Sequence, residues 1–95
     1  MNKITVGVLR GGPSAEYEIS LSTGQNILKH LPQNKYKTLD ILLTKKGEWH
    51  ANGMVASPDK IFRATDVIFN ALHGEFGEDG KVQRLFEMYG VPYTG

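Results

Sequence analysis

Residues 67–80 read VIFNALHGEFGEDG. The apolar run at residues 67–69 is typical of a buried strand, and it ends abruptly in a loop with three glycines, one histidine and three acids. Glycine lets a backbone turn tightly and approach a ligand closely. In an open α/β sheet, ligands bind beyond the carboxyl ends of the strands. We therefore expect a ligand site in this loop, with a helix starting near Lys81.

A similar strand and loop stand near the start of the chain. Residues 4–9 (ITVGVL) have the short, β-branched composition of a strand buried on both faces, and the turn residues RGGPS follow at 10–14. The helical stripe after this turn consists of Tyr17, Leu21, Gly24, Leu28 and Leu31. Ser14 is predicted to cap that helix, and Glu16 lies in its first turn, where the helix dipole favours an anion. Gly24 is expected to allow close contact with the sheet.

The middle of the chain contains one further strand and a short excursion. Residues 36–44 are rich in leucine and isoleucine, which predicts a second strand. Residues 45–57 predict a small hairpin, because the Asn52-Gly53 pair is a turn signal. Residues 57–59 (SPD) open either a loop or a brief helix before the next strand.

The order of the elements predicts the fold class and brings two distant residues together. The last helix is expected to begin after Asp79 as its cap and to end at Gly90, and residues 92–95 begin another extended piece. Alternating strands and helices indicate an α/β fold in three layers, a parallel sheet with flanking helices and right-handed crossovers. Both glycine loops then lie at one edge of the sheet. The topology therefore predicts that Glu16 and His73 are close in space.

The composition limits the classes of protein to which the chain can belong. Ninety-five residues predict one small domain, and 11 basic against 10 acidic residues leave a net charge of +1. That balance favours neither a nucleic-acid partner nor a membrane surface. Without cysteine there is no disulfide framework and no thiolate metal site. No apolar run approaches the roughly 20 residues that cross a bilayer. The start lacks the features of a signal peptide, so we expect a cytoplasmic protein.

Two glycine-rich segments resemble nucleotide motifs but lack their spacing. Residues 11–16 (GGPSAE) do not match G-x-G-x-x-G, and Glu16 would place a negative charge where a pyrophosphate rests. Residues 77–81 (GEDGK) imitate the end of a P-loop, but too few residues separate the glycines and Val82 follows the lysine. A carboxylate near a helix start is better suited to an ammonium group.

Three blocks of sequence resemble the amino-terminal motifs of D-alanine–D-alanine ligases. They are GGPSAE with ISLSTG (residues 11–16 and 19–24), LHG with GEDG and Gln83 (residues 72–74 and 77–80), and GVPYTG (residues 90–95). The resemblance implies that residues 1–95 form the first of three domains, the Rossmann-like pre-ATP-grasp domain. ATP and Mg²⁺ (or Mn²⁺) would be bound by the ATP-grasp domains, which are absent from this chain.

The resemblance also implies an activity and partners. The parent enzyme would join two D-alanines with ATP for peptidoglycan synthesis, usually as a homodimer through this region. Family ligases choose D-alanine or D-lactate as the second substrate outside this chain. The isolated domain is expected to be inactive, because the groups that stabilise phosphoryl transfer belong to the other domains.

The family motif gives roles to four residues. Glu16 matches the catalytic acid that holds the ammonium of the first D-alanine, and His73 matches the histidine lining the same subsite. Ile19 matches a position that touches the substrate. Glu78 is expected to orient His73 by accepting its ring proton. The residues alone also permit a solvated helix-dipole acid, a strand-end histidine, a core isoleucine and a solvated loop acid, respectively.

Two other functions remain open from the sequence. One is a nucleotide-binding Rossmann-like module, which the glycine loop at residues 11–12 would serve. The other is a structural dimerisation domain, a role that is compatible with the ligase hypothesis.

Overall fold

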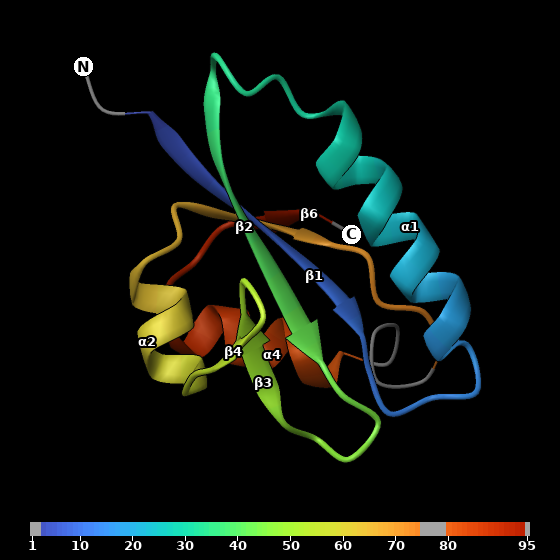
Figure 1. Ribbon diagram of the computed structural model, residues 1–95. Helices are drawn as coiled ribbons and strands as arrows, with labels where there is room; N and C mark the ends of the chain where they lie inside the picture. The colour runs from blue at the N-terminus through green and yellow to red at the C-terminus, as the bar shows by residue number, and fades with distance from the viewer. Residues whose placement is uncertain (1–2, 75–79, 95) are drawn as a thin grey trace.

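The computed structural model describes residues 3–74 and 80–94. The elements in chain order are β1 (Ile4–Gly11), α1 (Tyr17–His30), β2 (Tyr36–Leu43), β3 (Trp49–Ala51), β4 (Met54–Val55), α2 (Pro58–Arg63), β5 (Val67–Asn70), α4 (Lys81–Met88) and β6 (Tyr93–Thr94). The strands and helices expected from the sequence are therefore present (Figure 1).

The strands form one six-stranded sheet in the order β4-β3-β2-β1-β5-β6. Strand β1 pairs in parallel with β2 on one side and β5 on the other, and β6 adds in parallel to β5. Strands β3 and β4 add antiparallel beyond β2. The predicted α/β class is confirmed, with a parallel centre and an antiparallel edge. Because β1 and β5 are parallel neighbours, the loops that follow them leave the same edge of the sheet.

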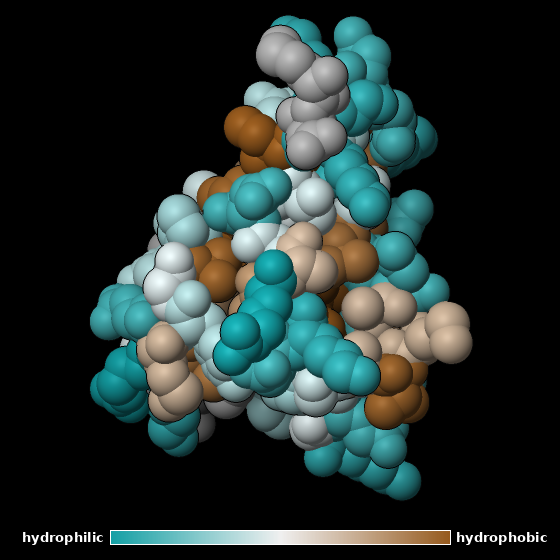
Figure 2. Space-filling view, turned by 90° about the vertical axis from the view of Figure 1, so that its left-hand side faces the viewer, coloured by the Kyte–Doolittle hydropathy of each residue, from teal (hydrophilic) through white to brown (hydrophobic). Residues whose placement is uncertain are grey.

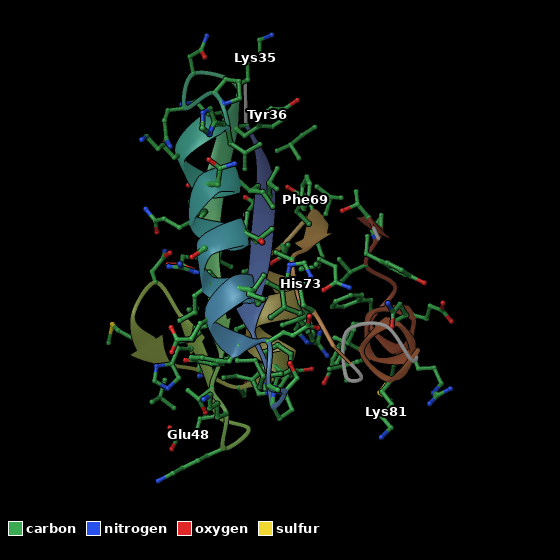
Figure 3. All side chains as sticks on the ribbon, turned by 90° about the vertical axis from the view of Figure 1, so that its right-hand side faces the viewer. Lys35, Tyr36, Glu48, Phe69, His73 and Lys81 are labelled. Carbon is green, nitrogen blue, oxygen red and sulfur yellow. The ribbon has the colours of Figure 1, made fainter. Side chains whose placement is uncertain are left out.

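The helices lie in two layers, α1 on one face of the sheet and α2 with α4 on the other (Figures 1 and 3). The main core lies on the α2–α4 face. It consists of Leu9, Ile41, Leu43, Ile61, Phe62, Ile68, Leu72, Val82, Phe86 and Val91. The Phe62 ring meets Trp49 and Phe86 edge-on, at centroid distances of 5.5 and 5.7 Å, an arrangement that aromatic pairs favour. On the side of the molecule seen in Figure 2, hydrophobic residues are interspersed among hydrophilic ones.

The small hairpin at the sheet edge is confirmed. Strands β3 and β4 pair antiparallel, and the turn residues Asn52 and Gly53 have φ values of 49° and 85°. Positive φ at both central residues is what a type I′ turn requires. The Asn52 side chain also accepts from the Asp40 backbone N–H at 2.9 Å, which ties the turn to β2. Of the two alternatives at residues 57–59, the structure has the brief helix, α2, capped by Ser57.

The helix boundaries differ in part from those expected. Ser14 was predicted to cap α1, but the helix begins at Tyr17 and its N-cap is Glu16. The predicted cap of α4, Asp79, lies outside the described residues, and Gly80 occupies the N-cap position. Gly90 ends α4 as predicted, with a φ of 67° that suits glycine.

Candidate functional site

A buried hydroxyl joins the two strands whose loops form the site. The Ser20 side chain is fully buried, and its Oγ accepts from the Gly11 N–H at 2.9 Å while donating to the Ala71 carbonyl at 2.7 Å. Gly11 ends β1, and Ala71 follows β5. Because Ser20 belongs to α1, one side chain fixes the helix and both strand ends relative to one another.

Ser14 joins the two loops themselves. Its hydroxyl donates to the His73 carbonyl at 3.0 Å and accepts from the Glu16 backbone N–H at 3.1 Å. Ser14 therefore accepts from a backbone N–H just before the helix, but α1 begins only at Tyr17, with Glu16 at the N-cap position. Gly74, next along the chain, has a φ of +83°, and a Cβ atom there would lie 2.7 Å from Ser14 Oγ and 3.4 Å from Glu16 Oε2. The Glu16 carboxylate therefore lies against the Gly74 backbone.

A cavity opens between these loops. Its volume is about 430 Å³, and it is lined by Pro13, Ser14, Ala15, Glu16 and Gly74. Glu16 is exposed and stands at the N-cap of α1, where the positive end of the helix dipole favours a negative charge. A glutamate that only balanced the helix dipole would not have to lie against a second loop. The arrangement offers an exposed carboxylate beside an open cavity, which can hold a cation such as an ammonium group.

His73 reaches α1 rather than the lining of this cavity. Its backbone lies in the second loop, beside α1 (Figure 3). Its half-buried ring places Nε2 3.1 Å from Thr23 Oγ1. Ile19, in the first turn of α1, is 55% exposed, which rules out the interpretation of this residue as core. The topology brings the two loops together, with Ser14 Oγ 3.0 Å from the His73 carbonyl, whereas a subsite shared by the Glu16 and His73 side chains stays a prediction. Glu78 lies outside the described residues.

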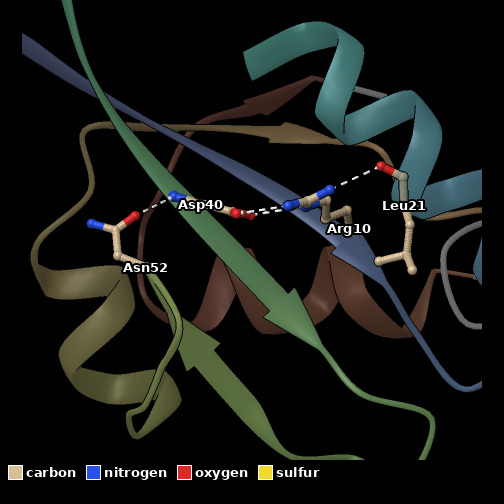
Figure 4. Close-up of polar contacts among 4 residues, drawn as sticks. All are labelled: Arg10, Leu21, Asp40 and Asn52. Carbon is tan, nitrogen blue, oxygen red and sulfur yellow. Dashed lines mark hydrogen bonds and ion pairs between the residues drawn. The ribbon is translucent and has the colours of Figure 1, made fainter. Parts of the chain in front are cut away.

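An ion pair beneath α1 helps to hold the helix that carries Glu16 (Figure 4). Arg10 Nε and Nη2 donate to the two carboxylate oxygens of Asp40 at 2.9 and 2.7 Å, and Nη1 donates to the Leu21 carbonyl at 3.0 Å. The hydrogen bonds to Asp40 raise the pKa of Arg10 above its ordinary value. Gly24 was expected to permit close helix–sheet contact, and it does: a Cβ there would lie 2.5 Å from Arg10 Cδ.

Sequence reasoning missed the hydroxyl groups that assemble the site. Glu16, Ser20 and Thr23 follow the spacing i, i+4, i+7, so they lie on one face of α1. That spacing is visible in the sequence, but a search for helical stripes among apolar residues alone does not find it. The face is polar because it meets strand ends and loop carbonyls rather than the apolar core.

The described residues do not fit the implied ATP and metal ion. The loop after β1 ends at the Glu16 carboxylate, which repels phosphate at the helix start where an anion would otherwise bind. Within residues 3–74 and 80–94, no group of three or more His, Cys, Asp or Glu side chains could hold a metal ion. In the same part of the chain, no helix has the length and apolar character to span a membrane.

Known structures resemble this fold closely. The VanG D-Ala:D-Ser ligase of Enterococcus faecalis matches with a TM-score of 0.84 and 26% identity, covering 97% of this chain and 35% of that one. The D-alanine-D-alanine ligase of Coxiella burnetii matches with a TM-score of 0.83 and 28% identity, covering 98% of this chain and 35% of the other.

Sequence relatives agree with the structural ones. The D-alanine--D-alanine ligase of Solibacter usitatus is 38% identical over 93 residues, which are 98% of this chain and 28% of that protein. The vancomycin/teicoplanin A-type resistance protein VanA of Enterococcus faecium is 35% identical over 121 residues, covering 100% of this chain and 35% of its own length. The chain therefore spans about a third of the length of these relatives.

A family model gives the same result from residue 5 to residue 95. The model described as "D-ala D-ala ligase N-terminus" matches residues 5–61 and 50–95. These matches include both loops that enclose the cavity beside Glu16. The chain accordingly belongs to the family of D-alanine–D-alanine ligase amino-terminal domains.

Proposed function

We propose that this chain supplies part of the first D-alanine subsite of a D-alanine–D-alanine ligase. The observation that carries the proposal is the Glu16 carboxylate against the Gly74 backbone, beside a cavity of about 430 Å³ at the carboxyl edge of the sheet. A relative named as a D-Ala:D-Ser ligase and others named as D-alanine--D-alanine ligases have D-alanine in common. A subsite for that shared substrate suits the domain that they also share.

The role of Glu16 in this proposal is to hold the ammonium group of the amino acid. A charge-assisted hydrogen bond of this kind contributes about 1.5–3 kcal/mol. At the α1 N-cap the carboxylate lies where the positive end of the helix dipole favours a negative charge. Ile19, one turn further along α1, is exposed and so available to contact the substrate. Holding the amino end directs the substrate's carboxylate away from Glu16 and toward the rest of the ligase.

The rest of the ligase would perform the chemistry. Residues 1–95 would be the amino-terminal domain, with ATP and Mg²⁺ held by the ATP-grasp domains of the parent enzyme. The peptidoglycan pathway, the homodimer and the cytoplasmic location remain predictions from the family resemblance and the composition. Because the chemistry is assigned to the other domains, we also expect that the chain alone catalyses no ligation.

Titrating the chain with D-alanine tests the subsite. One ion pair cannot offset the cost of immobilising a small ligand, so we expect a dissociation constant weaker than about 1 mM. The backbone N–H signal of Gly74 in a ¹H–¹⁵N NMR spectrum should shift as D-alanine is added. Glu16→Gln should abolish the shift, whereas Glu18→Gln, an exposed acid in the same helical turn, should retain it.

The controls decide between this proposal and its alternatives. Adding ATP and D-alanine to the chain should release no phosphate, and turnover above background would refute the partial-site proposal. ATP-induced shifts at Gly11 and Gly12 would favour the nucleotide-binding module instead. D-alanine shifts that are unaffected by Glu16→Gln would remove that carboxylate from the site.

A further inference from the structure

Thr23 makes two contacts through one oxygen atom. Its Oγ1 lies 3.0 Å from the Ile19 carbonyl oxygen, one turn back along α1, and 3.1 Å from His73 Nε2. Both distances fall in the hydrogen-bonding range. The threonine is half-buried, as is the histidine, so both groups are partly withdrawn from water. Three residues from two distant parts of the chain therefore share one hydroxyl.

Counting protons gives a direction to each bond. A threonine hydroxyl has one proton to donate and two lone pairs that accept. The Ile19 carbonyl can only accept, so its bond uses the hydroxyl proton, in the i to i−4 pattern common for threonine in helices. The hydroxyl then has only lone pairs left for the imidazole. The bond to His73 is satisfied when Nε2 carries a proton and donates it.

From this geometry we propose that Thr23 is a positioning residue that holds the His73 ring with its proton on Nε2. In the neutral ring, Nδ1 is then the hydrogen-bond acceptor. Ser14 fixes the same residue a second time, because its hydroxyl donates to the His73 carbonyl at 3.0 Å. One contact on the backbone and one on the ring define the orientation of the imidazole as well as its tautomer.

The tautomer has a consequence for the ligand, and this step rests on the proposed function. An ammonium group carries donors alone, so it is complemented by acceptors. Glu16 supplies one. We assign the second to Nδ1 of His73, which belongs to the adjoining loop but not to the lining of the cavity, so the ligand would have to extend beyond that lining to meet the ring. A ring with the proton on Nδ1 would instead present a donor to a donor. Thr23 would thus make the loop suitable for an amino acid's positive end without touching the ligand.

Ring-nitrogen NMR spectra of the ¹⁵N-labelled chain test the tautomer directly. The spectra, recorded at about pH 8, report which ring nitrogen carries the proton. We expect the Nε2–H pattern for His73, with an Nε2 proton that exchanges slowly. His30 is an internal control, because its Nδ1 lies 2.8 Å from the Asn26 carbonyl, which can only accept. His30 should therefore show the opposite pattern, and His73→Gln identifies which signals belong to residue 73.

Two substitutions separate the hydroxyl from the shape of the side chain. Thr23→Val keeps the branched shape but removes the hydroxyl, so the His73 nitrogen shifts should move toward the averaged values of a free imidazole and its ring proton should exchange rapidly. Thr23→Ser keeps the hydroxyl and should preserve the wild-type spectrum. An Nδ1–H pattern for His73 in the wild-type chain, or unchanged nitrogen shifts in Thr23→Val, would overturn the proposal.

Kinetics of the parent ligase separate this inference from the proposed function. Thr23→Val should raise the KM for the first D-alanine several-fold with a smaller change in kcat, and Thr23→Ser should restore the wild-type KM. If Thr23→Val changes the tautomer of His73 but leaves the KM for the first D-alanine unchanged, the role of His73 in the substrate site is refuted. A tautomer that does not depend on Thr23 would refute the inference itself and leave the role of Glu16 standing.

Discussion

The side chain of Glu16 and the backbone of Gly74, 58 positions apart in the sequence, lie so close that a Cβ atom on the glycine would be 3.4 Å from Oε2 of the glutamate. Neither residue could form the site alone. Parallel pairing of β1 with β5 brings the loops that follow them to one edge of the sheet. The hydroxyl groups of Ser14 and Ser20 then bond to the His73 and Ala71 carbonyls and hold the two segments together. The position of the carboxylate is therefore a product of the sheet topology.

Glu16→Gln in the full-length ligase should weaken the binding of the first D-alanine. Losing a charge-assisted hydrogen bond of about 1.5–3 kcal/mol corresponds to a rise of roughly 10- to 100-fold in KM for that substrate. Steady-state kinetics with D-alanine measures it. Glu18→Gln removes a charge from the same turn of α1 but should leave KM unchanged. Equal effects of the two substitutions would mean that the helix dipole, rather than substrate binding, explains the loss.

Tyr93 should titrate above its ordinary pKa. Its hydroxyl donates to Glu87 Oε2 at 2.8 Å, and this hydrogen bond raises the pKa of Tyr93 above the ordinary value of 10.0. Because the folded-state pKa is the higher one, the bond contributes to stability in full below about pH 10, and the contribution is lost as the pH rises through the raised pKa. Glu87→Gln should lower the pKa of Tyr93 toward 10.0 in an NMR titration. An unchanged titration midpoint in this variant would contradict the assignment.

Much of the fold was predictable because its signals are local. Residues 4–9 and 67–69 are apolar runs of strand length, and Asn52-Gly53 specifies its turn through the positive φ of both residues. The family motif and the parallel topology also placed Glu16 and His73 in neighbouring loops. These inferences need only the order of the elements along the chain.

The hydroxyl contacts were not predictable, because their partners come from distant segments. Ser14 has the sequence position of a helix cap, but its hydroxyl bonds to the His73 carbonyl, 59 residues away. Thr23 reads as a neutral helix residue until the second loop places an imidazole beside it. Local sequence indicates which hydrogen bonds a side chain can make within its own helix. Contacts with distant segments determine which hydrogen bonds it makes in the folded protein.

Ser20→Ala should destabilise the chain markedly for such a small change. The substitution leaves the Gly11 N–H and the Ala71 carbonyl without the bonds that Ser20 makes in a fully buried position, at a cost of about 1–3 kcal/mol for each group. Urea denaturation measures the loss. Ser22→Ala is the control, since Ser22 is an exposed position of the same helix and should change stability little. A destabilisation no larger than that of the control would show that water replaces the lost hydroxyl.

Gly74→Ala should both destabilise the fold and disturb the cavity. The position has a φ of +83°, which alone costs a residue with a side chain about 1–2 kcal/mol. The new methyl would also lie 2.7 Å from Ser14 Oγ and 2.8 Å from Ser14 Cβ, so Ser14 must move away from the His73 carbonyl.

Gly47→Ala separates these two causes. Gly47 has a similar φ of +92° but open space where the methyl would go, so it should show the backbone cost alone. Thermal unfolding of both variants gives the difference, which is the cost of crowding at the site. The Gly74 variant should also lose the D-alanine-induced NMR shifts, because Ser14 Oγ anchors the Glu16 backbone N–H and Glu16 moves with it. If the two variants are equally stable and both retain those shifts, then close packing of Gly74 against Ser14 and Glu16 does not shape the subsite.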